Sequence, residues 1–261
     1  MCLYLLLKTN YFMIVYPNAK INLGLNILRK RNDGYHDISS LFYPLKNCVD
    51  ILEVVRSNNF AFTKSGIEIE SEKNICVKAW ELINSEFRIG NVKIHLHKQI
   101  PIGAGLGGGS ADAAFTLMAL NDIYNLNISK QQFESYAIQL GADCPFFIDN
   151  TPKIVEGIGD KMIRYDVNLS DFEIKLVIPD FSISTKEAYQ NISPLIPQNN
   201  LREILKLPLD TWKENLKNDF EDTIFKKYPN LDVIKKELYN QGAIYASMTG
   251  TGSVLYGIFR K

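Results

Sequence analysis

The sequence predicts an α+β fold with two domains, and three observations support this class. Apolar residues alternate in several short segments, which is typical of half-buried strands. Helix-like segments follow them without the regular strand–helix alternation of a doubly wound sheet. A chain of 261 residues that is 46% hydrophobic is long enough to bury a sizeable core, as one large domain or two smaller ones. We place the two domains at residues 13–160 and 161–261.

Charge and cysteine content exclude some classes of partner. Lys plus Arg and Asp plus Glu number 29 each, so there is no overall basic field for nucleic acid or an anionic membrane. The four cysteines are scattered without a Cys-x-x-Cys pair, which is typical of a reduced, cytoplasmic protein. The apolar run at residues 3–7 is too short for a membrane span or a signal segment. Because Met13 precedes the first well-patterned strand, we expect residues 1–12 to be a dispensable extension or an upstream start. The sequence does not indicate an oligomeric state.

The first patterned strand begins at Ile14, and its apolar residues alternate from Ile21 to Ile27. Lys20 and Asn22 project from the opposite face of this strand. On local evidence that face is solvated, since lysine side chains are normally exposed.

The segment Asn32-Asp33-Gly34 is a strong turn signal. Tyr35 and His36 leave this turn toward a second strand at residues 38–45. An aromatic ring and an imidazole beside a turn could stack on a bound ring and form a hydrogen bond to it. They could equally begin an ordinary strand, and the local sequence leaves both interpretations open.

Another strand is predicted at residues 91–97, after a helix capped by Asn74 or Ser71. His95 and His97 lie on the outer face of this strand, at a spacing that could ligate a metal ion. No third ligand is near in sequence, so we expect a solvated strand face instead.

Residues 101–112 are the most distinctive stretch: Pro101-Ile102-Gly103-Ala104-Gly105-Leu106-Gly107-Gly108-Gly109-Ser110-Ala111-Asp112. Glycine permits positive φ angles and close approach of a ligand to the backbone. A glycine loop that opens a helix presents unpaired N–H groups and the positive end of the helix dipole to an anion. The pattern favours a phosphate-binding loop over a flexible linker. We expect Ser110 to be the N-cap of a helix at residues 111–124.

Three common glycine loops do not account for this stretch. The spacing Gly103-x-Gly105-x-x-Gly108 matches the dinucleotide fingerprint, but the acid expected about twenty residues later, Asp122, lies within a predicted helix. A P-loop would need a Gly-Lys-Ser/Thr sequence, which is missing. A protein-kinase loop would need an Ala-x-Lys strand and a His-Arg-Asp loop, which are also missing.

The second half of the chain continues the mixed pattern. Ser129 and Gln132 have the spacing of a capping box, and Gly141 marks the end of the helix that they begin. Asp143 follows as a single acid before Pro145, and an ordinary turn aspartate is the simplest interpretation of this segment alone. We further expect a hairpin at 153–165, a strand at 173–178, and a second glycine turn at 249–253 that leads into the strand 254–259.

Three separated segments together resemble the GHMP kinases, the family of galactokinase, homoserine kinase and mevalonate kinases. The segments occur in the family's order: 17–23, 101–113 and 248–253. The resemblance covers essentially residues 13–261. It implies an N-terminal part like the second domain of ribosomal protein S5 and a ferredoxin-like C-terminal part. It also implies ATP and Mg²⁺ as cofactors.

The resemblance reverses the local interpretation of three residues. It implies that Lys20, Asn22 and Asp143 converge beside the transferred phosphate. Asp143 would accept the proton of the substrate hydroxyl, and Lys20 would keep Asp143 ionised and stabilise developing negative charge. Asn22 would form a hydrogen bond to the same group.

The nucleotide-binding residues follow from the same resemblance. Loop amides would hold the β-phosphate, and Ser110 would reach a phosphate or its Mg²⁺. The implied ATP contacts are Pro101, Ile102, Gly103, Ala104, Gly105, Leu106, Gly107, Gly108, Gly109, Ser110, Ala111, Asn74 and Lys98. Several family members also place a glutamate on Mg²⁺, and we find no matching acid here. The chain ends at Lys261, soon after the third segment, so the C-terminal part looks minimal.

The four segments 19–23, 33–36, 106–110 and 141–145 together resemble one member of the family, which phosphorylates an alcohol linked to cytidine diphosphate. The resemblance implies that Tyr35 stacks on the cytosine and that His36 forms a hydrogen bond to the polar edge of the base. Phe42 and Tyr189 match positions that flank the base, and Thr185 matches one near the substrate. Two alternatives remain: a family kinase with a mevalonate- or homoserine-like acceptor, and a non-catalytic nucleotide-binding or structural protein. The implied partner is a small-molecule substrate, with no nucleic acid and no membrane.

Overall fold

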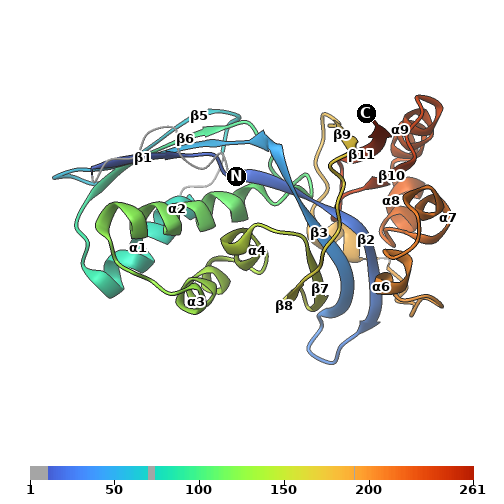
Figure 1. The fold of residues 1–261 in the computed structure, drawn as a ribbon, viewed down its shortest axis with the longest axis horizontal. Coiled ribbons are helices and arrows are strands. Elements are labelled where there is room, and N and C mark those ends of the chain that lie inside the picture. Colours follow the sequence, from blue (N-terminus) through green and yellow to red (C-terminus); the bar gives the residue numbers. More distant parts are fainter. Residues whose placement is uncertain (1–10, 70–73, 191) are drawn as a thin grey trace. The chain divides into compact units, whose positions relative to one another are not determined.

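The computed structural model describes residues 11–69, 74–190 and 192–261, which divide into two compact units. Unit 1 lies within residues 1–20, 44–102 and 107–151, and unit 2 comprises 21–43, 103–106 and the described part of 152–261 (Figure 1). These units differ from the consecutive ranges 13–160 and 161–261, which stay a prediction. The difference arises because residues 21–43, which form most of the first long hairpin, belong to the same unit as residues after 151.

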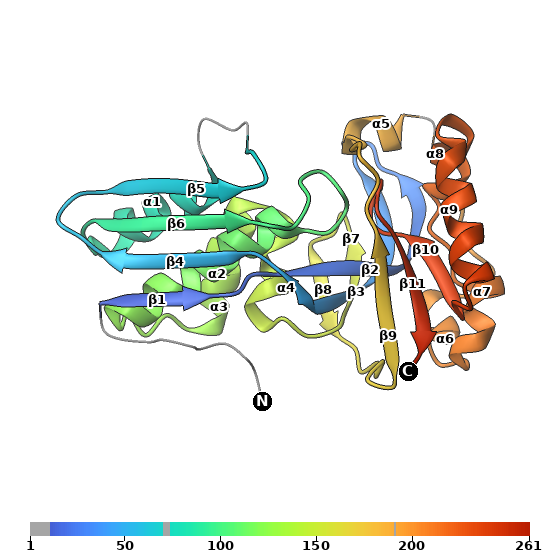
Figure 2. The same ribbon diagram turned by 90° about the horizontal axis from the view of Figure 1, so that it is seen from above.

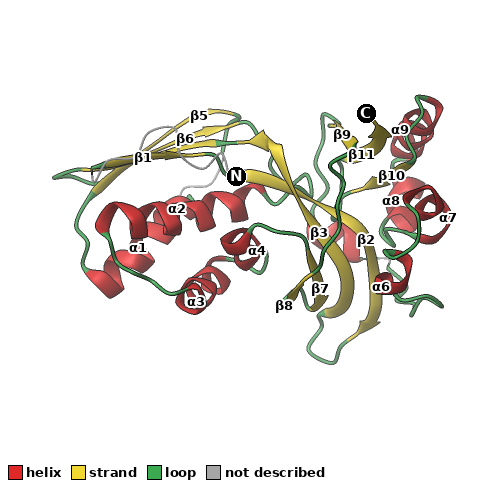
Figure 3. Ribbon diagram, viewed as in Figure 1, coloured by secondary structure: helices red, strands yellow, loops and turns green. Residues whose placement is uncertain are grey.

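Unit 1 contains a four-stranded sheet with the strand order β1-β4-β6-β5. The strands are β1 (Phe12–Val15), β4 (Ile51–Arg56), β5 (Ala61–Gly66) and β6 (Val92–Lys98), and β5 runs parallel to β6. The helices are α1 (Ile75–Phe87), α2 (Gly108–Tyr124), α3 (Lys130–Leu140) and α4 (Cys144–Asp149). Figure 3 shows α1 and α2 together on one face of this sheet. The helix α2 is buried along most of its length, so it forms the centre of the unit-1 core.

Unit 2 contains most of a second sheet, with the order β2-β3-β7-β8, and a three-stranded sheet, with the order β10-β11-β9. The strands are β2 (Asn18–Lys30), β3 (His36–Val49), β7 (Lys153–Gly157), β8 (Lys161–Arg164), β9 (Phe172–Val177), β10 (Tyr245–Met248) and β11 (Leu255–Arg260). The helices are α5 (Thr185–Tyr189), α6 (Leu201–Ile204), the 3₁₀ turn η1 (Leu209–Thr211), α7 (Trp212–Asn215), α8 (Glu221–Lys227) and α9 (Pro229–Asn240). Figure 2 shows α8 and α9 alongside β10 and β11.

Several predicted elements are confirmed. Asn74 caps α1 by accepting a hydrogen bond from the N–H of Cys76, whereas the alternative cap Ser71 lies outside the described residues. Ser129 and Gln132 form the expected capping box, and α3 ends before Gly141. The hairpin β7–β8 and the glycine turn between β10 and β11 also lie where the sequence placed them.

Two local expectations are wrong. Ser110 does not cap α2, because the helix begins at Gly108 and its N-cap is Gly107, at φ +70°. The left-handed conformation of Gly107 lets the chain turn into the helix three residues earlier than a cap at Ser110 would. The solvated face assigned to Lys20 and Asn22 is also wrong: both residues are buried, at 3% and 1% exposure.

The remaining sequence-level expectations concern the membrane, the cysteines and the N-terminus. Within the described residues, no helix combines the length and the apolar character needed to cross a bilayer. Cys48, Cys76 and Cys144 are free thiols. Residues 1–10 lie outside the described part. Phe12, the first residue of β1, pairs with Val55 of β4.

Candidate active site

Lys20 and Asp143 form an ion pair within unit 1. The Nζ atom of Lys20 lies 3.8 Å from Oδ2 of Asp143, and the two side chains are 4% and 33% exposed. Burial lowers the pKa of Lys20 below its usual value, and the Asp143 carboxylate offsets part of this effect. The pair therefore places a desolvated cation beside a carboxylate that solvent can reach, as a proton acceptor requires.

Gly107 packs against the stem of Lys20. A Cβ atom on Gly107 would lie 3.1 Å from Cγ of Lys20 and 3.2 Å from Cζ of Phe147. The φ angle of +70° also disfavours any side chain at this position. Glycine is thus needed both for the turn into α2 and for the space that Lys20 occupies.

The N-terminus of α2 offers hydrogen-bond donors beside this pair. The N-cap Gly107 provides no side-chain cap, and the first N–H groups of a helix have no partner within the helix. A Cβ atom on Gly109 would meet nothing within 4 Å, so the backbone there is open to a ligand. The Ser110 hydroxyl bonds the thiol of Cys144, the residue after Asp143, and burial raises the pKa of that thiol to about 12. These features fit an anion at the start of α2.

A reciprocal amide pair connects the two elements that carry Lys20 and Asp143. Asn18 and Asn150 exchange side-chain hydrogen bonds of 3.2 and 2.6 Å. Asn18 begins β2, two residues before Lys20, and Asn150 ends the helix α4 that Asp143 caps. This buried pair fixes the start of β2 against the end of α4, which accounts for the meeting of Lys20 with Asp143.

Lys98 lies at the end of β6 in a buried ion cluster. Its Nζ atom is 2.6 Å from Asp50 and 2.7 Å from Asp112. A Cβ atom on Gly108 would lie 3.0 Å from this Nζ atom, so the ammonium sits directly under the first turn of α2. Asp50 also accepts hydrogen bonds from the N–H groups of Gln99 and Ile100. The predicted contact of Lys98 with ATP stays a prediction, as does that of Asn74, whose side chain caps α1.

In unit 2, Asn22 bonds to the glycine turn that follows β10. Its side-chain Nδ2 donates to Ser40 (2.8 Å), and its Oδ1 accepts from Oγ1 of Thr249 (3.3 Å). The Thr249 hydroxyl also lies 3.1 Å from the carbonyl oxygen of Gly105. The first and third GHMP-like segments therefore meet at the Thr249 side chain, while the predicted contact of Asn22 with substrate stays a prediction.

The turn between β2 and β3 carries the aromatic residues predicted to bind a base. Tyr35 is 61% exposed, whereas His36 stacks on Tyr189 with ring centroids 4.9 Å apart. Burial and the nearby Lys30 lower the pKa of His36, which favours the neutral imidazole. Tyr189 also meets Phe220 edge to face, at 4.8 Å. The structure thus brings His36 and Tyr189 together and leaves Tyr35 in solvent.

The other predicted acceptor residues lie elsewhere in unit 2. Phe42 is buried in β3, paired with Lys153 of β7. Thr185 is the first residue of α5, after the N-cap Ser184. Their contacts with substrate stay predictions.

No group of three or more His, Cys, Asp or Glu residues in the described part of the chain is arranged to hold a metal ion. His95 bonds Thr63 and Ser65, and His97 bonds Ser65. The predicted contact of Ser110 with Mg²⁺ stays a prediction.

Sequence reasoning missed several residues around the site. Asp50 and Asp112 hold Lys98, and Asn218 and Glu221 hold the turn at residues 248–250. Only Asp112 lay within a recognised segment, the glycine-rich one. The others were isolated polar residues in loops or at the start of a helix, and no local pattern distinguishes them.

Two family models match this chain. The model described as GHMP kinases N terminal domain matches residues 74–150, and the one described as GHMP kinases C terminal matches residues 200–261. The first match contains the glycine-rich loop and Asp143, and the second contains the turn at Thr249.

Curated relatives and solved structures agree with these matches. The 4-diphosphocytidyl-2-C-methyl-D-erythritol kinase of Parabacteroides distasonis is 47% identical over 95% of this chain and 92% of its own length. The enzyme of the same name from Bacteroides fragilis is 49% identical over 95% of this chain and 92% of its own. A crystal structure of 4-(cytidine 5′-diphospho)-2C-methyl-D-erythritol kinase covers 94% of this chain and 90% of its own, with a TM-score of 0.83 and 29% identity. A homoserine kinase from Cytophaga hutchinsonii shares the fold, with a TM-score of 0.62 and 16% identity over 100% of this chain and 88% of its own.

Proposed function

The chain belongs to the GHMP kinase family, and from this membership we propose that it phosphorylates the 2-hydroxyl of 4-diphosphocytidyl-2-C-methyl-D-erythritol with ATP. The observation that carries this proposal is the Lys20–Asp143 pair beside Gly107, in a chain whose relatives are named for that compound. The reaction belongs to the non-mevalonate route to isoprenoid precursors.

Asp143 and Lys20 have distinct roles in the proposed transfer. The Asp143 carboxylate accepts the proton of the acceptor hydroxyl, whose oxygen forms a bond to the γ-phosphorus of ATP. The bond from that phosphorus to the bridging oxygen breaks, ADP leaves, and Asp143 returns its proton to solvent. The Lys20 ammonium, beside the Asp143 carboxylate, stabilises the negative charge on the acceptor oxygen. Its low exposure strengthens this effect, because charges interact more strongly away from water.

The first turn of α2 supplies the proposed phosphate contacts. Its N–H groups point to the end of the helix that favours negative charge, and the backbone at Gly109 is open. The Ser110 hydroxyl is the proposed protein contact of Mg²⁺. Mg²⁺ bound with ATP would neutralise part of the phosphate charge. The remaining ATP contacts implied by the family, from Pro101 to Ala111, rest on the same resemblance.

His36 and Tyr189 are the proposed recognition elements for cytosine. Their stacked rings offer an apolar face and one imidazole edge. A small carboxylate acceptor such as homoserine or mevalonate would give these rings no base to contact. The pair therefore favours the cytidine compound over the other acceptors of the family.

A panel of acceptors tests the proposal. The protein is mixed with MgATP and either the cytidine compound, mevalonate, homoserine or no acceptor, and the release of ADP is followed. We expect acceptor-dependent ADP release with the cytidine compound alone, and a new phosphate signal on its 2-oxygen by ³¹P NMR. Release with another alcohol would assign that acceptor instead, and no release with any of them would favour a non-catalytic protein.

A further inference from the structure

The segment Asn218-Asp219-Phe220-Glu221, in unit 2, leads into α8, and its side chains contact β2, α5 and the turn after β10. Asn218 is 1% exposed. Its side-chain Nδ2 donates to the carbonyl oxygens of Met248 (2.8 Å) and Gly250 (2.9 Å), and its Oδ1 accepts from the N–H of Phe220 (3.1 Å). The side-chain amide of Asn218 therefore donates both of its hydrogens to carbonyl oxygens at the turn after β10.

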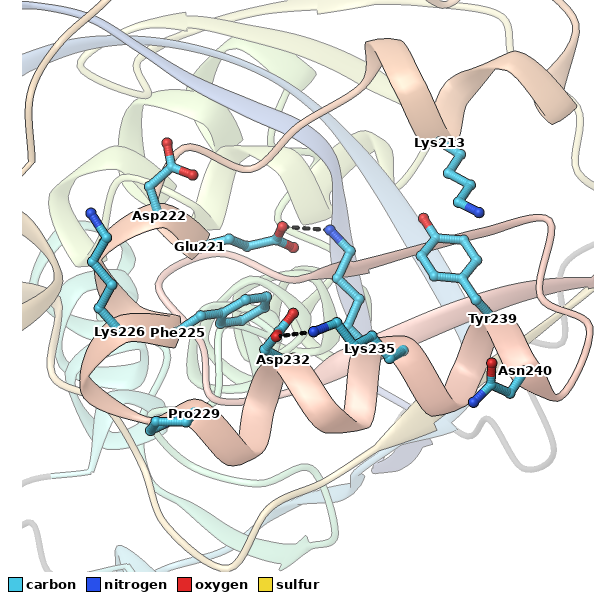
Figure 4. A pocket seen from close by; sticks show the side chains of 11 residues that line it. Lys213, Glu221, Asp222, Phe225, Lys226, Pro229, Asp232, Lys235, Tyr239 and Asn240 are labelled. Atoms are coloured by element: carbon cyan, nitrogen blue, oxygen red, sulfur yellow. Dashed lines mark hydrogen bonds and ion pairs between the residues drawn. The ribbon is translucent and has the colours of Figure 1, made fainter.

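Glu221 holds the same turn from its other side. Oε1 accepts hydrogen bonds from the Ser247 hydroxyl (2.9 Å) and the Met248 N–H (2.7 Å). Oε2 accepts from Lys235 of α9 (2.6 Å), at an open pocket of about 720 Å³ between α8 and α9 (Figure 4). Three donors thus satisfy a carboxylate that is 5% exposed, as a buried charge requires.

This turn is in close backbone contact with Gly105 of the glycine-rich loop. A Cβ atom on Gly105 would lie 2.1 Å from the carbonyl oxygen of Thr249, and one on Gly250 would lie 3.0 Å from Cα of Gly105. The Thr249 hydroxyl adds a hydrogen bond to the Gly105 carbonyl. Because this contact joins backbone to backbone, a shift of the turn must move Gly105, two residues before Gly107 in the chain.

Phe220, between these two residues, supports the aromatic pair. Its ring meets Tyr189 edge to face at 4.8 Å, and Tyr189 stacks on His36. Asp219 fixes the segment to β2 by accepting from the N–H of Ile27 (2.8 Å) and the side chain of Asn26 (3.3 Å). One four-residue segment therefore supports two separate parts of unit 2.

We propose that residues 218–221 are a positioning element: Asn218 and Glu221 set the glycine-rich loop for ATP, and Phe220 sets the His36–Tyr189 pair for the acceptor. The assignment of the two sides to ATP and acceptor rests on the proposed function. The positioning of the turn by Asn218 and Glu221 stands on the hydrogen bonds alone.

Two variants, each expected to affect the use of a different substrate, test this proposal. Asn218→Ser removes at least one of the two bonds to the turn, and Phe220→Leu removes the aromatic edge beneath Tyr189. Asn215→Ser is the matched control, because Asn215 is exposed at the end of α7, three residues away. Steady-state kinetics give kcat and the KM of each substrate, and hydrogen exchange by mass spectrometry follows the amides of residues 249–252.

Asn218→Ser should speed exchange in the turn about tenfold, the effect expected for one lost buried hydrogen bond. It should also lower kcat or raise the KM of ATP, and leave the KM of the cytidine compound unchanged. Phe220→Leu should raise the KM of the cytidine compound and spare that of ATP. If both variants change both KM values alike, or if exchange rises evenly over unit 2, the segment is merely structural and the proposal is overturned.

The exchange measurement separates this proposal from the proposed function. If the wild-type protein does not phosphorylate the cytidine compound, the proposed function fails, and exchange at residues 249–252 still decides whether Asn218 positions the turn. If Asn218→Ser does not fold, Glu221→Gln takes its place, because a glutamine has a single acceptor oxygen and cannot accept from both Lys235 and the Met248 N–H as the carboxylate does. An unchanged turn in that variant, with unchanged kinetics, would also overturn the proposal.

Discussion

The ammonium of Lys20 lies 3.8 Å from the carboxylate of Asp143, although one residue belongs to β2 and the other precedes α4. The reciprocal Asn18–Asn150 bonds connect these elements. A nearly buried cation beside a partly exposed carboxylate is an arrangement suited to accepting a proton and stabilising an alkoxide.

Asp143→Asn should abolish most of the turnover while nucleotide binding stays nearly intact. An amide cannot accept the hydroxyl proton, and loss of general base catalysis costs about 100- to 10,000-fold in rate. The measurement is kcat, with ATP binding followed by calorimetry. Asp149→Asn, on the same short helix, is the control and should retain activity. Turnover near the wild-type rate in Asp143→Asn would remove Asp143 as the base.

Lys20→Met should lower kcat at least about 100-fold and raise the stability of the fold. The rate falls because the charge that stabilises the transition state is lost. The free energy of unfolding, from urea titration at neutral pH, should rise by about 1 kcal/mol, because a buried ammonium whose pKa is lowered by desolvation destabilises the folded state. A change in KM alone would make Lys20 a binding residue.

Much of the structure around the glycine-rich loop is predictable from the sequence, because it is determined by residues that are close together in the chain. The glycine-rich loop, the helix after it and the capping box at Ser129 each follow from residues within one or two turns of chain. The burial of Lys20 does not, since the alternation along β2 says nothing about α4, which packs there from a distant part of the sequence. The resemblance to the GHMP kinases predicted that Lys20 lies beside Asp143. The contacts of Lys98 with Asp50 and Asp112 became apparent only in the structure.

Gly107→Ala should reduce kcat by displacing Lys20. The new Cβ atom would lie 3.1 Å from Cγ of Lys20, at a φ of +70° that costs about 1 kcal/mol or more for alanine. Gly90→Ala is the matched control in unit 1, because Gly90 has a φ of +85° and nothing within 4 Å of its Cβ position. Both variants should lose similar stability in urea, but only Gly107→Ala should lose activity. Equal losses of activity would show that backbone strain, and not the contact with Lys20, is responsible.

His36→Ala should raise the KM of the cytidine compound about tenfold or more and spare the KM of ATP. The expected size corresponds to the loss of one ring that stacks on a base. His97→Ala, on β6 of unit 1, controls for the loss of an imidazole elsewhere in the chain. Equal weakening of both substrates in His36→Ala would remove the reason for choosing a cytidine acceptor.

Asp112 should make the stability depend on pH through the neutral range. Burial, together with repulsion from Asp50, raises the pKa of Asp112 to about 8, although Lys98 opposes the shift. Its Oδ1 atom is buried without a hydrogen-bond partner. Because the folded value lies above the unfolded value of 3.8, the folded state binds the extra proton between these limits. The stabilisation is complete below the unfolded pKa and is lost as the pH rises through the folded one.

Comparison with Asp112→Asn isolates this titration, because the amide cannot ionise. From about pH 6 to about pH 9, the wild type should lose stability relative to the variant, by at most about 1.4 kcal/mol per pH unit up to the folded pKa. Urea unfolding at several pH values measures the difference. Asp122→Asn, on the same helix, controls for the removal of a carboxylate from α2. A difference for Asp112→Asn that does not change with pH would mean that Lys98 keeps Asp112 ionised across the whole range, and the raised pKa would be wrong.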